Sequence, residues 1–163
     1  MMSHLEIQGN ELADYVREAV RVSHQHVTNG GIPFSGVVVN GGQVLATGFN
    51  RVREDNDPTA HAEVVALRAA TAAHGLDATA GATLIASGEP CALCYMAALY
   101  FGVSHVVYAV DRRTAAQYGF DYSGSYSLFA RDPATWPLKV TSLQVPGGTK
   151  PFEEYLSTHG RQM

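Results

Sequence analysis

The first strong pattern in the chain is a helical one. Leu12, Val16 and Ala19 are apolar and are spaced so that they fall on one face of a helix between residues 11 and 26. Residues 29–33, which include two glycines and a proline, interrupt this spacing. We therefore predict a first helix over residues 11–26.

A change of period follows. Residues 34–39 and 43–48 are two short apolar runs, and valine is frequent in the first of them. Asn40, Gly41 and Gly42 stand between the runs and are typical of a tight hairpin turn. The two runs therefore predict an antiparallel pair of strands.

From residue 61 onward, helical and strand patterns alternate, with polar or irregular segments at residues 50–60 and 119–133. Thr59 is a residue type that can cap the helix beginning near His61. Strands that alternate with helices imply a sheet that is parallel beyond its first hairpin and covered by helices on both faces. The predicted helices cover residues 61–75, a stretch from Cys91 to about Tyr100, 114–118 and 151–158, and the predicted strands cover 82–87, 105–110 and 138–145.

Length and charge narrow the possible functions. The 163 residues suit one domain over residues 1–163, and 46% of them are hydrophobic. Charged residues make up 16%, below the usual figure of about 25%, so part of the surface is available for subunit contact. The net charge is −4, and lysine and arginine form no run. A nucleic acid partner is therefore not expected, because phosphate contacts need a basic face.

The chain shows no pattern for export or membrane insertion. Residues 1–6 lack the charged and then apolar pattern of a signal peptide, and no apolar stretch approaches the ~20 residues that span a bilayer. Two cysteines are too few for a disulfide scaffold. We expect a cytoplasmic protein without a membrane partner.

Four residues carry candidate chemistry. His61, Cys91 and Cys94 are ligand types that zinc prefers, and three protein ligands leave a fourth tetrahedral position open for water. Both cysteines lie at a predicted helix start, where the helix dipole favours thiolates. Glu63 is close enough in sequence to reach that water without binding the metal, so we assign it the catalytic proton transfers.

Two other interpretations of residues 91–94 remain: a dithiol redox pair and a small structural zinc knuckle. A structural zinc site usually needs a fourth protein ligand, and the chain has no third cysteine. The remaining histidines are taken as ordinary surface or core residues, because a solitary histidine needs partners to act as a ligand. They are His4, His24, His26, His74, His105 and His159.

The spacing of these four residues, with Pro90 before the first cysteine, is similar to the H-x-E and P-C-x-x-C signature of zinc-dependent base deaminases. The chain thus resembles the cytidine and nucleobase deaminase superfamily. The resemblance implies a three-layer α/β/α sandwich with a five-stranded mixed sheet. It also implies Zn2+ as cofactor and the hydrolytic release of ammonia from an amino-substituted nucleobase or nucleoside.

Within the superfamily, residues 56–64 resemble both bacterial guanine deaminases and tRNA adenosine deaminases. Residues 115–121 and 151–152 resemble guanine deaminases more, which favours a guanine-like purine as the small-molecule substrate and a role in purine metabolism. A cytosine or cytidine deaminase is the alternative, and a tRNA adenosine deaminase fits the acidic balance less well.

The resemblance also suggests substrate contacts. Asn50 matches an asparagine that reads the base, and Phe34 matches an aromatic residue on which the ring stacks. Ala62 and Pro90 flank the pocket and offer backbone groups. Two of these residues also have a purely structural interpretation: Asn50 as a turn residue and Phe34 as a core residue.

Two departures from guanine deaminases are visible. Those enzymes have paired aspartates where this chain has Asp121 and Tyr122, so a phenol replaces the second carboxylate. Their tail ends in an aromatic residue that closes over a neighbouring subunit's site, whereas residues 160–163 here contain none. We still assign Asp121 and Tyr122 to the substrate pocket, and the family leads us to expect a homodimer.

Overall fold

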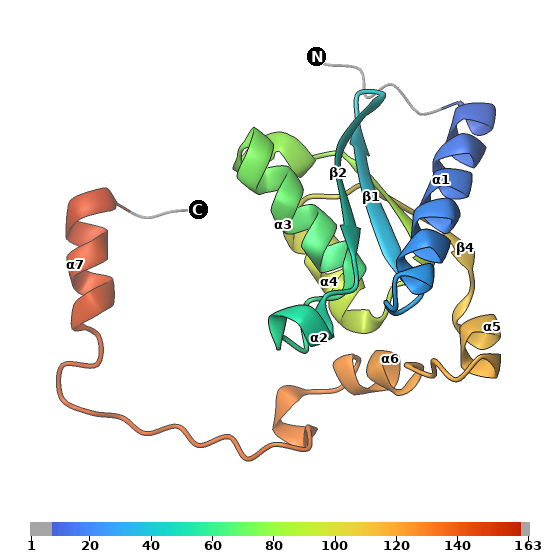
Figure 1. The fold of residues 1–163 in the computed structure, drawn as a ribbon. Helices are drawn as coiled ribbons and strands as arrows, with labels where there is room; N and C mark the ends of the chain where they lie inside the picture. The colour runs from blue at the N-terminus through green and yellow to red at the C-terminus, as the bar shows by residue number, and fades with distance from the viewer. Residues whose placement is uncertain (1–7, 161–163) are drawn as a thin grey trace. The chain divides into compact units, whose positions relative to one another are not determined.

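The computed structural model describes residues 8–160, so the expectations for residues 1–6 and 161–163 lie outside the described residues. The chain divides into two compact units, one ending at Ala130 and the other beginning at Arg131. The first unit contains a four-stranded sheet in the order β2-β1-β3-β4 (Figure 1). Its strands are β1 (Ser35–Asn40), β2 (Gln43–Phe49), β3 (Thr83–Gly88) and β4 (His105–Val110).

Helices cover both faces of this sheet, which confirms the three-layer α/β/α sandwich (Figure 1). In β1, Val37 and Val39 face α1, whereas Val38 faces the opposite layer, because successive side chains of a strand alternate between the two faces. Each face therefore has its own apolar core. The covering helices are α1 (Gly9–Thr28) on one face, and α3 (Ala62–His74) with α4 (Ala92–Tyr100) on the other.

The predicted hairpin is confirmed. Strands β1 and β2 pair antiparallel, and Asn40 lies opposite Gln43. Gly41 and Gly42 have φ values of 57° and 73°, the left-handed conformation that a two-residue hairpin turn of this kind requires. Strand β1 also pairs antiparallel with β3, and β3 pairs parallel with β4. The sheet is thus mixed, as expected.

The prediction of a fifth strand at residues 138–145 is wrong. The described residues form a sheet of four strands, and residues 138–145 belong to none of them. Leu138, Val140 and Leu143 are 59%, 68% and 82% exposed. The alternation of apolar and polar residues is real, but a strand forms only where a neighbouring strand supplies hydrogen bonds and cover.

Four short helical segments among the described residues were missed in the sequence. Two of them lie in the stretches that the polar composition marked as irregular, and short helices carry little periodic signal. Residues 52–55 and 124–129 form α2 (Val52–Asp55) and α6 (Gly124–Phe129), and a 3-10 turn, η2, covers Pro133–Thr135. The predicted helix at residues 114–118 is present as α5 (Arg112–Gln117), and a further 3-10 turn, η1, covers Leu76–Thr79.

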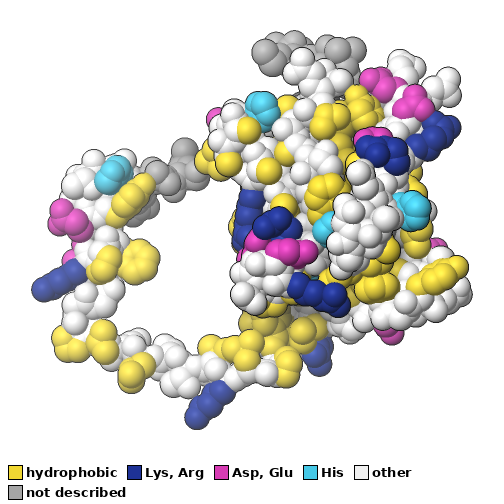
Figure 2. Space-filling model, viewed as in Figure 1, with side chains coloured by type: hydrophobic (Ala, Val, Ile, Leu, Met, Phe, Trp, Pro, Cys, Tyr) yellow, Lys and Arg dark blue, Asp and Glu magenta, His cyan; other side chains and the backbone are white. Residues whose placement is uncertain are grey.

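The second unit contains α7 (Lys150–His159), which confirms the predicted closing helix. Apolar side chains are conspicuous on the surface of this unit (Figure 2). Phe152 on α7 is 77% exposed. The apolar residues of the segment that precedes α7 are exposed to a similar degree. The unit therefore leaves uncovered much of its own apolar surface. The single-domain interpretation of residues 1–163 stays a prediction.

Within residues 8–160, the structure contains no helix with the length and apolar character required to cross a membrane.

Candidate active site

Two helix starts meet at one edge of the sheet. Strands β2 and β3 both run antiparallel to β1, so their carboxyl ends lie at the same edge. His61 directly precedes α3 and Cys91 directly precedes α4, and both have extended backbone conformations. The two helices follow β2 and β3, which are not adjacent in the sheet, because β1 lies between them.

The expected cap at Thr59 is wrong. The residue at the N-cap of α3 is His61, and its side chain makes no capping hydrogen bond. Thr59 instead donates its hydroxyl to Asp57, at 2.7 Å. The cap position is occupied by a potential metal ligand, and the imidazole therefore remains available to other partners.

Two glycines allow α3 to approach the sheet closely. A Cβ at Gly48 of β2 would lie 2.5 Å from the backbone nitrogen of Ala66 and 2.6 Å from the carbonyl oxygen of Ala62. A Cβ at Gly36 of β1 would lie 3.1 Å from the Cα of Glu63. Any larger residue would push away the first turn of α3, which carries the candidate catalytic carboxyl.

His61, Cys91 and Cys94 converge as a possible metal-binding group, with their ligand atoms all within 4.8 Å of one another. The Nδ1 atom of His61 lies 3.4 Å from each sulfur, and the two sulfurs are 3.6 Å apart. Tetrahedral zinc with normal bond lengths would separate such ligand atoms by roughly 3.5–3.8 Å. The donor set and its spacing therefore fit zinc.

The charges in the group support metal binding. The hydrogen bond with Cys94 and the imidazole of His61 lower the pKa of Cys91 to about 4. The same pairing with Cys91, together with burial, raises the pKa of Cys94, and hydrogen bonding to Cys91 raises the pKa of His61. One thiolate thus forms readily, and a divalent cation is the partner that would stabilise the second.

Glu63 lies beside the ligands. Its side chain is buried, and its Oε2 atom accepts a hydrogen bond from Cys94 at 3.3 Å. Burial raises the pKa of Glu63 above its usual value, because an apolar environment disfavours the charged form. A carboxyl with a raised pKa next to a metal group is suited to taking up and returning protons.

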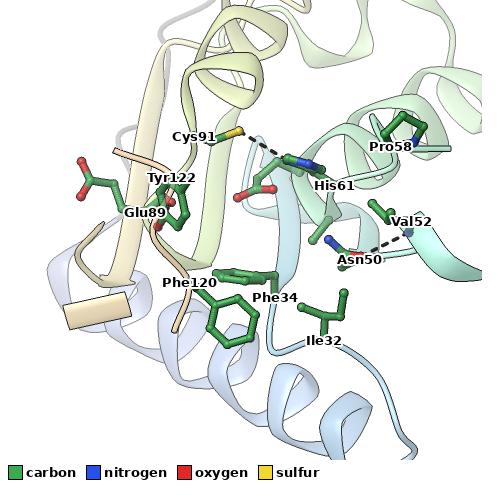
Figure 3. A pocket seen from close by; sticks show the side chains of 12 residues that line it. Ile32, Phe34, Asn50, Val52, Pro58, His61, Glu89, Cys91, Phe120 and Tyr122 are labelled. Carbon is green, nitrogen blue, oxygen red and sulfur yellow. Dashed lines mark hydrogen bonds between the residues drawn. The ribbon is translucent and has the colours of Figure 1, made fainter. Parts of the chain in front are cut away.

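His61 and Cys91 open onto a pocket of about 290 Å³ (Figure 3). This volume is near the lower limit of roughly 300 Å³ for small-molecule sites. Predicted residues that line it include Phe34, Asn50 and Tyr122, together with Ala62. Loop and apolar positions carry little sequence signal for a role in a pocket. The lining also contains residues that the motifs therefore did not indicate: Ile32, Val52, Pro58, Glu89 and Phe120.

Asn50 is held in one orientation. Its Oδ1 atom accepts a hydrogen bond from the backbone N–H of Val52 at 3.2 Å. The backbone N–H of Asn50 donates to the backbone carbonyl oxygen of Phe34 at 3.2 Å. The backbone carbonyl oxygen of Asn50 also lies 3.2 Å from the Nε2 atom of His26. Because the bond to Val52 fixes the amide, the Nδ2 group of Asn50 is placed to recognise a ligand as a donor.

Two predicted substrate residues lie elsewhere. Pro90 does not line the pocket, and its carbonyl oxygen accepts a hydrogen bond from the hydroxyl of Tyr126. Asp121 borders a separate hollow with Arg112, and its carboxylate accepts hydrogen bonds from the backbone and hydroxyl of Ser123. The structure thus brings Tyr122, but not its neighbour Asp121, to the pocket.

Comparisons with known proteins agree with this geometry. The family described as "Cytidine and deoxycytidylate deaminase zinc-binding region" matches residues 10–110. Guanine deaminase of Bacillus subtilis (strain 168) is 39% identical over 113 residues, which is 69% of this chain and 72% of that protein. A tRNA-specific adenosine deaminase of Agrobacterium fabrum is 39% identical over 80 residues, which is 49% of this chain and 53% of that protein. Some longer relatives are matched over less than a fifth of their length.

Solved structures extend the likeness to the fold. The X-ray structure of guanine deaminase from Bacillus subtilis matches with a TM-score of 0.81 and 30% identity, covering 93% of this chain and 97% of that one. A protein solved in complex with 2,6-diaminopurine matches with a TM-score of 0.61 and 28% identity, covering 72% of this chain and 64% of that one. With the family match over more than half of its length and a zinc-type ligand group at the expected residues, the chain belongs to the zinc-dependent cytidine and deoxycytidylate deaminase family.

Proposed function

We propose that this protein hydrolytically deaminates an amino-substituted nucleobase or nucleoside, with a guanine-like purine favoured, and releases ammonia. The observation that carries the proposal is that His61, Cys91 and Cys94 meet beside the buried carboxyl of Glu63 at the wall of a pocket. Zinc held by these three residues would activate water as the nucleophile.

In this mechanism, Glu63 moves the protons. Its Oε2 atom takes a proton as water attacks the carbon that carries the amino group, and then passes protons to the ring nitrogen and to the departing ammonia. Phe34 offers an aromatic surface to the ring, and Asn50 offers a donor to its edge. The apolar wall limits the access of bulk water.

The relatives support the substrate class. Guanine deaminase of Bacillus subtilis matches most of this chain, and the neighbouring structure in complex with 2,6-diaminopurine shows that a protein of this fold holds a purine. The pocket is of a size for a base, and the net charge of −4 argues against a polynucleotide. A tRNA adenosine deaminase and a cytosine or cytidine deaminase are the alternatives.

A glutamine substitution tests the mechanism. We expect Glu63→Gln to keep stoichiometric zinc and to lower kcat by about 10²–10⁴-fold, because the amide cannot accept and return protons. Zinc content and ammonia release are measured together. Glu54→Gln, at an exposed position of α2, is the matched control and leaves both unchanged. Full turnover in the Glu63 variant would contradict the mechanism.

A substrate screen separates the alternatives. Ammonia release from guanine, guanosine, cytosine, cytidine and adenine is compared with release from a tRNA anticodon stem. A redox dithiol protein would contain no stoichiometric zinc, and a structural zinc module would release no ammonia from any of these compounds.

We also propose a homodimer in the cytoplasm. The exposed apolar residues of the second unit, including Leu143 and Phe152, form a surface that a second copy of the chain would cover. Cys91 and Cys94 are free thiols at ligand positions, which a reducing compartment preserves.

A further inference from the structure

The pocket has two unlike flanks. Figure 3 shows Asn50 and Val52 on one side and Tyr122 and Glu89 on the other, with Phe34 between them. On the first flank, the amide oxygen of Asn50 accepts the backbone N–H of Val52, and this bond turns the Nδ2 donor towards the ligand. An acceptor atom of the substrate ring on that side would pair with this donor.

Among the described residues that line the pocket, none offers an available carboxylate on the second flank. The Oε2 atom of Glu89 accepts a hydrogen bond from the backbone N–H of Arg112 at 2.8 Å, and its Oε1 atom lies 3.6 Å from the Nε atom of Arg112. Its carboxylate is thus engaged, and Figure 3 shows it pointing away from Phe34. Asp121 is outside the pocket and bound to Ser123.

Tyr122 occupies the main-chain acceptor on this flank. Its hydroxyl donates to the carbonyl oxygen of Glu89 at 2.6 Å, and its ring meets Phe34 edge-on, with centroids 6.3 Å apart. The surrounding segment is fixed as well, because Ser125 accepts a hydrogen bond from the backbone N–H of Ala92 at 3.2 Å. Tyr122 is therefore held in place rather than free to swing away.

These contacts dictate how a 2-aminopurine ring would fit. Its amino-bearing carbon has two ring nitrogens as neighbours. The Nδ2 donor of Asn50 pairs with a nitrogen that carries no hydrogen, which in guanine is N3. The N1–H of guanine then faces Tyr122, where it meets the neutral oxygens of a phenol and a backbone carbonyl instead of a carboxylate.

Resting on the proposed function, we infer that Tyr122 is a specificity-determining residue that makes this flank neutral. The site thereby favours 2-aminopurines whose N1 carries no hydrogen, such as 2-aminopurine itself, relative to guanine. A ring N–H that gains no charge-assisted partner forfeits about a tenfold advantage in affinity or rate.

Two substitutions of Tyr122 that are isosteric with each other test this inference. Tyr122→Asp and Tyr122→Asn both remove the phenol and free the carbonyl of Glu89, but aspartate alone adds a negative charge. We expect the ratio of kcat/KM for guanine to that for 2-aminopurine to rise about tenfold or more in the aspartate variant relative to the asparagine variant. Using a ratio cancels the intrinsic reactivities of the two rings. Equal ratios in both variants would overturn the inference.

A binding measurement on the full chain covers the case in which these variants do not fold. In the Glu63→Gln variant, which keeps Tyr122, displacement of fluorescent 2-aminopurine by guanine gives the relative affinities without turnover. We expect guanine to bind no more tightly than 2-aminopurine, and binding tighter by tenfold or more would overturn the inference alone. Ammonia release from neither ring by the unsubstituted protein would overturn the guanine-like substrate of the proposed function, and the inference with it.

Discussion

At the scale of single residues, the site separates metal binding from proton transfer. His61 and the two cysteines hold their ligand atoms within 4.8 Å of one another, while Glu63 contributes a buried carboxyl that contacts Cys94. Burying a carboxyl is costly, and its raised pKa reflects that cost. The arrangement therefore reserves a proton carrier next to the metal-binding group.

Metal removal gives a test at this scale. We expect a chelator to lower the thermal midpoint of unfolding and added zinc to restore it. A ligand that binds only the folded state, at a free concentration of 100 times its Kd, stabilises that state by about 2.7 kcal/mol. Differential scanning fluorimetry with metal analysis measures both effects. In Cys94→Ser, the midpoint should no longer respond to the chelator. If the thermal midpoint of the zinc-free, unsubstituted protein did not change when zinc was added, the assignment would be contradicted.

At the scale of elements, the site depends on how closely α3 lies on the sheet. Gly48 in β2 and Gly36 in β1 face the first turns of α3, and the space that they leave lets the backbone of Ala62 and Glu63 approach. Strands β2 and β3 end at the same edge, so the starts of α3 and α4 lie side by side. The position of the ligands thus follows from backbone packing.

A single methyl group tests that packing. We expect Gly48→Ala to destabilise the protein by about 1–3 kcal/mol and to weaken zinc binding, because its Cβ would lie 2.5 Å from the backbone nitrogen of Ala66. Denaturant unfolding and zinc titration measure the two effects. Gly9→Ala is the matched control, since its Cβ would meet nothing within 4 Å. Equal stability of both variants would show that α3 can shift without cost.

At the scale of the whole molecule, the second unit raises the question of assembly. Its segment 138–145 and α7 expose apolar side chains that the second unit does not itself cover. Edge strand β4 in the first unit also exposes Tyr108 and Val110, at 39% and 38%. These surfaces are the physical basis for expecting a homodimer.

Sedimentation of the full chain tests this expectation. We expect a mass of two chains, and we expect Leu143→Asp to shift the distribution towards the monomer, because a charge at a covered apolar contact is costly. Thr141→Asp, at an exposed polar position of the same segment, is the matched control. A monomeric mass for the unsubstituted protein at micromolar concentration would rule out the homodimer.

The sequence by itself determined the features that depend on local spacing. The helical period around Leu12 and Val16, the Gly41–Gly42 turn and the apolar runs yielded α1 and the four observed strands, because period and turn chemistry act over a few residues. His61 and Glu63 are two residues apart, and Cys91 and Cys94 are three apart. These short intervals are also visible in the sequence alone, and they indicated a zinc-binding group.

Only the tertiary structure decided which groups are available at the pocket. The paired oxygen of Asn50, the engaged carboxylate of Glu89 and the hydroxyl of Tyr122 on a backbone carbonyl all depend on partners distant in sequence or on local backbone geometry. The missing strand at residues 138–145 has the same cause. Its pattern is suited to a sheet, but pairing requires a neighbouring strand that no local pattern can supply.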